Sequence, residues 1–171
     1  ILSCVKHFAA YSGAEAGRDY NTVDMSEMMF RERHLPSYKA AIEAGALSVM
    51  SSFNDFDGIP ASGNKWLLTD LLRDELGFKG FVVSDYNSIS EMTRHRVVAD
   101  KKDAACLALN AGLNMDMVDG SYYQFAEELV KEGRVSEAQI DKLCKDILTV
   151  KSKLGLFDDP FRYGGEGRWE K

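Results

Sequence analysis

Short strand-like segments alternate with helical patterns along this chain, and this alternation limits the folds that it can adopt. Four segments are predicted as strands: residues 2–8, 46–53, 81–85 and 114–118. Each is followed by a helical pattern, so that a strand–helix unit recurs about every 30 to 45 residues, which is typical of a parallel α/β sheet or barrel. About four such units and a terminal helix make half of an eight-stranded barrel.

The helical patterns have recognisable ends. The first covers residues 24–45, begins near Asp24 and Glu27, and contains Pro36, which predicts a kink or two helical pieces. The second, third and fourth cover residues 64–77, 100–112 and 121–133. The last begins at a capping box of Ser136 and Gln139 and stops at Gly155.

The two ends of the chain suggest how it is divided. The sequence of 171 residues begins inside an apolar run without Met, and after residue 157 turn residues and glycines replace the helical pattern. We expect residues 1–157 to be the C-terminal portion of a barrel domain. We expect residues 158–171 to be a linker towards a second domain outside this chain.

The composition limits the classes of molecule that this chain can be expected to bind. A net charge of −6 without a basic patch speaks against nucleic acid and suits a neutral substrate. No apolar run approaches the ~18 residues of a membrane span. Cys4, Cys106 and Cys144 form no pairable or C-x-x-C pattern, so we expect no disulfide framework, no metal site and no cofactor.

A single carboxylate follows the third predicted strand. The apolar or small residues 81–84 lead directly into Asp85, and burial of an unpaired charge is costly, so Asp85 is expected where the strand leaves the core. The carboxyl ends of parallel strands are where barrels bind ligands. Lys6 and His7 end the first strand, and together these groups suit a hydroxyl-rich ligand. From the residues alone, Asp85 is equally consistent with a helix cap or a structural aspartate.

Five segments, in order, resemble glycoside hydrolase family 3, with the best agreement to its β-glucosidase-type members. They are Val5-Lys6-His7-Phe8-Ala9, Gly17-Arg18-Asp19-Tyr20-Asn21, Leu35-Pro36, Met50-Ser51-Ser52-Phe53-Asn54 and Gly80-Phe81-Val82-Val83-Ser84-Asp85-Tyr86. A sixth segment, residues 154–160, resembles the exit from the family's first domain. The resemblance spans nearly the whole chain and implies part of a (β/α)8 barrel.

The resemblance also implies roles for individual residues. Asp85 matches the family's catalytic nucleophile. The positions that match sugar-binding or sugar-lining residues are Lys6, His7, Arg18 and Tyr86, and we add Phe53 as a wall of the site. Many members carry Tyr at the position of Phe53. This chain has Phe there and therefore lacks the tyrosine hydroxyl.

The implied activity is that of a retaining exo-β-glycosidase. Such an enzyme removes terminal non-reducing β-D-glycosyl residues from a β-glucoside or related oligosaccharide through a covalent glycosyl-aspartate. In β-glucosidase members a glutamate from a second domain is the acid/base, so this chain needs the remainder of its polypeptide and is expected to be inactive alone. The resemblance suggests a periplasmic or secreted protein.

Two other functions remain open at this stage. Lys6 could act as the nucleophile of a Schiff-base aldolase-type barrel, because a desolvated lysine attacks carbonyls. The chain could also be a sugar-binding module without turnover. The family's N-acetylglucosaminidases are disfavoured, because their K-H-F-P-G-H-G pattern is replaced here by Ala9, Ala10 and Tyr11 after Phe8.

Overall fold

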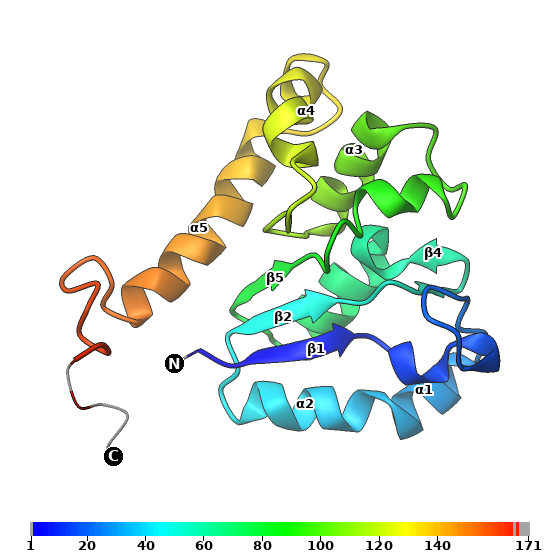
Figure 1. The fold of residues 1–171 in the computed structure, drawn as a ribbon, viewed down its shortest axis with the longest axis horizontal. Helices are drawn as coiled ribbons and strands as arrows, with labels where there is room; N and C mark the ends of the chain where they lie inside the picture. Colours follow the sequence, from blue (N-terminus) through cyan, green and yellow to red (C-terminus); the bar gives the residue numbers. More distant parts are fainter. Residues whose placement is uncertain (1, 166, 168–171) are drawn as a thin grey trace.

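A parallel sheet lies at the centre of the computed structural model, which describes residues 2–165 and 167 (Figure 1). Its strands are β1 (Cys4–Phe8), β2 (Ser48–Ser51) and β5 (Phe81–Val83), in the order β1-β2-β5. The register places Val49 beside both Val5 and Val82. Helical connections join strands that are neighbours in both sequence and sheet, which is the arrangement of a (β/α)8 barrel segment and confirms the predicted fold class.

The fourth predicted strand, residues 114–118, is wrong as a strand. Met115 makes an isolated parallel bridge to Val83, and its carbonyl accepts a hydrogen bond from Ser84 N at 2.8 Å. The Asn114 side chain accepts the Val82 backbone N–H at 2.8 Å. That N–H is therefore not available to a backbone ladder, although the segment runs where a fourth strand would lie.

The first predicted helix is two helices, as Pro36 led us to expect. They are α1 (Glu27–Arg33) and α2 (Leu35–Glu43). Pro36 lies in the first turn of α2, where its missing N–H has no helical partner to lose. The start was misplaced, because the hydroxyl of Ser26 rather than Asp24 accepts the hydrogen bond from Met29 N, at 3.2 Å.

Short elements connect the main units. They are the single turns η1 (Tyr11–Gly13), η2 (Glu15–Gly17), η3 (Ala61–Gly63) and η5 (Ser90–Thr93), and the hairpin of β3 (Asp55–Phe56) with β4 (Ile59–Pro60). All of them lie at or beyond the carboxyl ends of the strands. Irregular backbone is therefore concentrated where the candidate site residues are.

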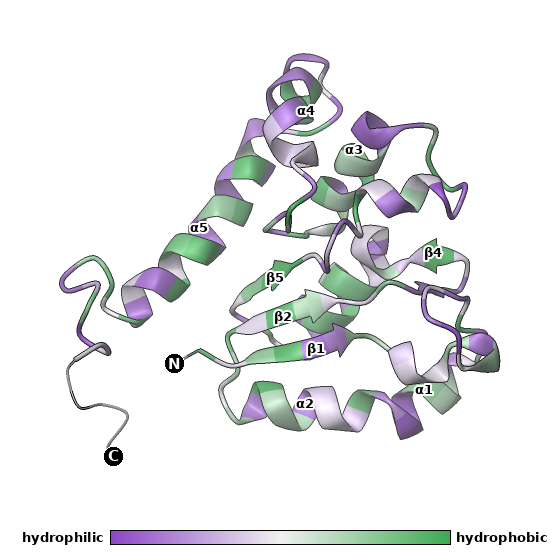
Figure 2. Cartoon of the chain, viewed as in Figure 1, coloured by the Kyte–Doolittle hydropathy of each residue, from purple (hydrophilic) through white to green (hydrophobic). Residues whose placement is uncertain are grey.

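The main core lies between the sheet and the helix η4 (Trp66–Glu75). Asn64 lies just before this helix, where the sequence predicted its start, and its side-chain oxygen accepts Leu67 N at 3.0 Å. The buried leucines of the helix are Leu67, Leu68, Leu71 and Leu72. Figure 2 shows the strands as mainly hydrophobic, with the end of β1 turning hydrophilic at the edge that carries the candidate site.

The remaining helices are α3 (Lys101–Ala111), α4 (Ser121–Lys131) and α5 (Glu137–Lys153). Asp100 caps α3, and Gly112, with φ of +92°, ends it as predicted. Ser136 caps α5 by accepting Gln139 N at 3.2 Å. The Gln139 side chain, however, donates to the Leu109 carbonyl, so it links α5 to α3 instead of closing the predicted capping box.

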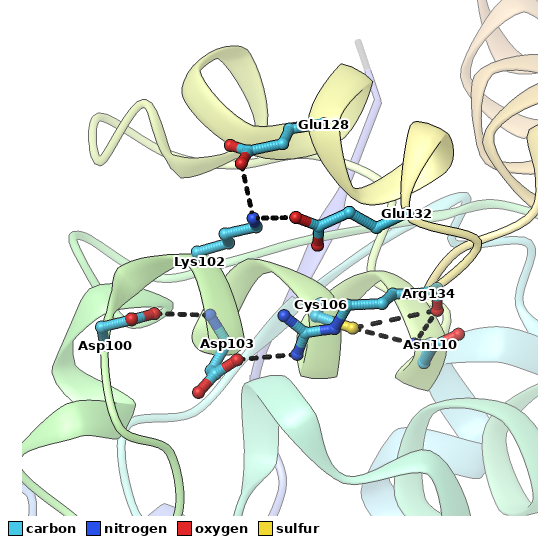
Figure 3. A network of polar contacts seen from close by, with 8 residues as sticks. All are labelled: Asp100, Lys102, Asp103, Cys106, Asn110, Glu128, Glu132 and Arg134. Carbon is cyan, nitrogen blue, oxygen red and sulfur yellow. Dashed lines mark hydrogen bonds and ion pairs between the residues drawn. The ribbon is translucent and has the colours of Figure 1, made fainter.

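Exposed ion pairs join α3 to α4 and the turn after it (Figure 3). Lys102 lies between Glu128 and Glu132, and Arg134 pairs with Asp103 at 2.7 Å. The Cys106 thiol packs beneath them against the Arg134 carbonyl. Exposed pairs of this kind add little stability individually, so the buried side chains between α3, α4 and α5 hold this layer together.

A buried polar cluster fastens α5 to the sheet. Arg73 donates to the Gly80 carbonyl at 3.2 Å and to the Asn114 side chain at 2.6 Å, and lies 3.3 Å from Asp146 of α5. Asn114 also donates to the Leu143 carbonyl at 3.0 Å. Burial lowers the pKa of Arg73, and the charge of Asp146 opposes that effect.

Beyond α5, residues 154–158 and 160–163 form turns, and part of the predicted linker, residue 166 and residues 168–171, lies outside the described residues. The proposed division at residue 157 stays a prediction. In the described part of the chain, no helix is long and apolar enough to cross a bilayer.

Candidate active site

Asp85 lies just beyond β5, at the carboxyl end of the sheet, as predicted. It is 8% exposed. Its Oδ1 accepts the backbone N–H of Tyr86 at 2.7 Å. Its Oδ2 is buried and accepts no hydrogen bond from the described residues, although Nε2 of His7 lies only 3.2 Å away. One oxygen of the carboxylate is therefore fixed by a hydrogen bond, and the other can still accept a hydrogen bond from, or react with, a ligand.

The end of β1 brings His7 to Asp85. The strand is irregular here, with a register shift between Val5 and Phe8 and cis peptide bonds at Lys6–His7 and Phe8–Ala9. The hydroxyl of Tyr38, from α2, donates to the His7 carbonyl. Burial lowers the pKa of His7; the charge of Asp85 opposes this, and the charge of Lys6 adds to it. The lowered pKa favours a neutral imidazole beside the carboxylate.

A cavity of about 470 Å³ opens next to His7. Its lining includes three of the predicted sugar-binding residues, Lys6, His7 and Arg18, together with Tyr11, Ser12, Ala14, Gly17, Asp19 and Tyr38. The ammonium of Lys6, the guanidinium of Arg18 and the carboxylate of Asp19 are exposed side chains. The cavity thus offers both donors and acceptors to a ligand that reaches Asp85.

Phe53 belongs to a row of aromatic rings along the site. His7 contacts Tyr11 edge-on at 5.3 Å, Tyr11 lies 5.9 Å from Phe53, and Phe53 lies 4.6 Å from Tyr20, between ring centroids. Phe53 thus packs between Tyr11 and Tyr20, and its role as a wall of the site stays a prediction. Tyr86 differs, because the residue is 57% exposed and it contacts Asp85 through its backbone N–H.

Sequence reasoning missed Tyr11 and Tyr38. Burial, together with the nearby charge of Asp19, raises the pKa of Tyr11 to about 12. Tyr38 comes from α2, and no local pattern indicates that its hydroxyl reaches the His7 carbonyl. Both residues lie between the segments that resemble the family. This proximity was the only feature of the sequence that could have pointed to them.

Buried serines support the segment that carries Asp85. The hydroxyls of Ser51, Ser62 and Ser88 form a row with separations of 2.8 and 2.7 Å. The Ser84 hydroxyl accepts Met117 N at 2.8 Å. These bonds tie the turn after β5 to β2 and to the neighbouring segment. Among the described residues, no group of three or more His, Cys, Asp or Glu side chains is arranged to hold a metal ion.

The family model described as "Glycosyl hydrolase family 3 N terminal domain" matches residues 1–150. The chain belongs to this family. Among its family relatives, the "Periplasmic beta-glucosidase" of Salmonella typhimurium is 44% identical over 165 residues, covering 96% of this chain and 22% of the relative. A "Beta-xylosidase" of Formosa agariphila is 41% identical and covers 92% of this chain and 23% of the relative. The chain therefore spans less than a quarter of the length of these relatives.

Solved structures agree with the family membership. A β-glucosidase from Listeria innocua in complex with glucose has a TM-score of 0.95 and 43% identity, covering 98% of this chain and 23% of that one. The same enzyme, as a mutant in complex with laminaribiose, has a TM-score of 0.94. At this identity the likeness covers the sequence as well as the fold.

Proposed function

We propose that this chain carries the nucleophile and much of the sugar site of a retaining exo-β-glycosidase of the β-glucosidase type. The observation that supports it most is the Asp85 carboxylate, with one oxygen bound to a backbone N–H and the other free beside His7. The adjoining cavity, lined by Lys6, His7 and Arg18, is the proposed place of the sugar ring.

In the first step, Oδ2 of Asp85 attacks the anomeric carbon as the bond from that carbon to the leaving oxygen breaks. A second carboxyl group, ~5–5.5 Å away in retaining enzymes, gives its proton to the leaving oxygen. The same group then takes a proton from water, which attacks the anomeric carbon and releases Asp85. His7 and Lys6 hold sugar hydroxyls, and the Tyr86 N–H steadies the oxygen of Asp85 that does not attack.

The second carboxyl group is proposed to come from outside this chain. In the proposed division, residues 1–157 are the C-terminal portion of the barrel domain, and residues 158–171 lead to a further domain that supplies the acid/base. The chain spans about 22% of the Salmonella relative, whose name also supports a place outside the cytoplasm. The proposed substrates are β-glucosides or related oligosaccharides.

The aldolase alternative has less support. A Schiff-base lysine is activated by desolvation or by a neighbouring cation, whereas Lys6 is exposed. The sugar-binding module without turnover remains an outcome of the experiment below.

The decisive experiment uses the full-length protein that contains this chain. A 2-deoxy-2-fluoro-β-glucoside should trap the glycosyl-enzyme, and peptide mass spectrometry should find the label on Asp85. Asp85→Asn should lower kcat for a 4-nitrophenyl β-glucoside by about 1,000-fold or more, since removing a nucleophile has effects of this size. A parallel assay with the β-xyloside tests which sugar is preferred.

Asp57→Asn is the matched control, because Asp57 is exposed on the β3–β4 turn and has no place in the proposed site. It should leave kcat unchanged. A label on another residue, or undiminished hydrolysis by Asp85→Asn, would overturn the proposal. Glucose binding without any hydrolysis by the wild type would favour the sugar-binding module.

A further inference from the structure

The turn that begins at Asp85 is held together by hydrogen bonds within itself. Ser88 N donates to the Asp85 carbonyl at 3.1 Å, and Glu91 N donates to the Asn87 carbonyl at 3.1 Å. The Ser90 hydroxyl donates to the same Asn87 carbonyl at 3.2 Å. Because these short-range bonds overlap along the chain, the turn is one compact piece, and a shift at its far end is carried to Asp85.

The sheet gives this turn a neighbour on each side. β5 pairs with β2, and its Val83 makes a bridge to Met115 on the other side. On the side of β2, the buried hydroxyls of Ser62 and Ser88 lie 2.7 Å apart and hold the middle of the turn. On the other side, the segment that contains Met115 continues alongside the turn as far as Asp119. This last residue contacts the far end of the turn.

Asp119 is a buried carboxylate that the proposed mechanism does not use. Its side chain is fully buried. Its Oδ2 accepts Ser90 N at 2.5 Å, and its Oδ1 accepts the Ser121 hydroxyl at 2.7 Å. Nζ of Lys101 lies 3.6 Å from the same Oδ1. A buried carboxylate is costly unless it is paired and hydrogen-bonded, and these three contacts meet that requirement.

The three contacts of Asp119 come from three different elements. Ser90 begins η5, Lys101 begins α3 and Ser121 begins α4. An ionised carboxylate has two acceptor oxygens and a charge, so one side chain can serve all three. The bonds to α3 and α4 stay within the helical layer. Only the bond to Ser90 leads to the turn that carries the nucleophile.

We propose that Asp119 is a positioning residue for the nucleophile, because through Ser90 it fixes the turn that keeps the free oxygen of Asp85 beside His7. This inference rests on the proposed glycosidase function and adds a residue, outside the sugar site, on which the rate depends. A misplacement of about 1 Å at the reacting atoms can cost ~100-fold in rate. Loss of Asp119 should therefore slow the attack on the sugar without weakening sugar binding.

The test separates the rate of attack from the affinity for the sugar. In the full-length protein, Asp119→Ala should lower kcat/KM for the 4-nitrophenyl β-glucoside by about tenfold or more. The rate at which the 2-deoxy-2-fluoro-β-glucoside labels Asp85 should fall by the same factor. The inhibition constant of glucose should stay within about threefold of the wild-type value, because the residues that bind the sugar are unchanged.

Two further variants distinguish the hydrogen bond to Ser90 from a general effect of the substitution. Asp119→Asn keeps an oxygen for Ser90 N and gains an amide that can donate to the Ser121 hydroxyl, so kcat/KM should recover to within about threefold of the wild type. Asp119→Ser can still pair with Ser121, but its hydroxyl is one bond too short for Ser90 N. It should show the same loss as Asp119→Ala, and it replaces that variant if the alanine protein does not fold.

Ser121→Ala is the matched control. It removes the other hydrogen bond of Asp119 and leaves the bond to Ser90 in place, and Ser121 is also fully buried. This variant should lower the midpoint of thermal unfolding and leave kcat/KM unchanged. All kinetic assays are made well below the unfolding midpoint of each variant, so that a loss of folded protein does not imitate a loss of rate.

The outcomes separate the two proposals. If the wild type is active and labelled at Asp85, but Asp119→Ala and Asp119→Ser keep the wild-type kinetics, this inference is overturned and the proposed function stands. The same holds if Ser121→Ala loses as much activity as they do, or if glucose binding falls as far as kcat/KM. If the wild type is neither labelled at Asp85 nor active, the proposed function fails, and this inference fails with it.

Discussion

At the scale of single residues, the site depends on how charge is distributed around His7. The imidazole is partly buried, it lies against the Asp85 carboxylate, and it follows the ammonium of Lys6 in the chain. Burial dominates and lowers its pKa, while its two charged neighbours act in opposite directions. The protonation state of His7 is therefore sensitive to changes in either neighbour.

This balance of charges predicts that the pKa of His7 shifts in opposite directions in two variants. Removing the negative charge with Asp85→Asn should lower the pKa of His7 further, whereas removing the positive charge with Lys6→Met should raise it. The chain contains three histidines, so their ring signals can be followed individually by NMR as the pH is varied. In the wild type, His7 should titrate below 6.5. Shifts of the same sign in both variants would contradict the prediction.

The same lowered pKa has a consequence for stability. Above about pH 6.5 His7 is neutral in both the folded and the unfolded chain. Below that value the unfolded chain binds the proton more readily, so the wild type should lose stability relative to His7→Gln as pH falls through the pKa of the folded state. Urea unfolding at a series of pH values measures this difference, and parallel curves for the two proteins would argue against it.

For single residues, the sequence predicted some positions in the site and missed others. It brought Asp85, Lys6 and His7 to one edge because parallel strands end on the same side. It did not find Tyr38, because a hydroxyl that reaches across from a helix follows no local spacing. It also did not anticipate that Tyr86 would contact Asp85 through its backbone.

At the scale of elements, Asn114 connects a strand, a helix and a neighbouring arginine. Its side chain accepts from Val82 N and Arg73 and donates to the Leu143 carbonyl. Asn114→Ala should therefore destabilise the chain by about 3 kcal/mol, since it leaves buried groups without partners. Chemical denaturation measures the loss. Asn110→Ala, in an exposed position on α3, is the control and should cost less than about 1 kcal/mol.

Asn114 also explains why the strand predicted at residues 114–118 is absent from the described structure. Apolar residues alternate with polar ones at Met115, Met117 and Asn114, Asp116, which resembles a strand, but the Asn114 side chain takes the backbone donor of Val82 that strand pairing would use. Helix positions were easier to predict, because periodic leucines and capping residues are local signals. The Gln139 contact with Leu109 shows the limit, since a long side chain near another helix can abandon its local partner.

At the scale of the whole molecule, β1 lies at an edge. In the described part of the chain it has β2 on one side and no strand on the other. Open edges promote association between chains. Expressed alone and kept reduced, the 171-residue chain should gain mass with concentration in analytical ultracentrifugation.

A charge on the edge should reduce this association. Cys4 is exposed on β1, so Cys4→Lys should lower the weight-average mass towards that of the monomer. Cys144→Lys places the same change on the exposed side of α5 and should leave the association intact. Equal behaviour of both variants would show that another surface drives the association.

The different bonding of the two Asp85 oxygens has a stereochemical consequence. A carboxylate whose two oxygens were both free could exchange them by a half-turn of its Cβ–Cγ bond. In Asp85 such a turn breaks the bond from Tyr86 N to Oδ1 and brings the bonded oxygen towards His7. The two oxygen positions are therefore inequivalent: one is occupied by the hydrogen bond from Tyr86 N, and only the other, beside His7, is open to a ligand.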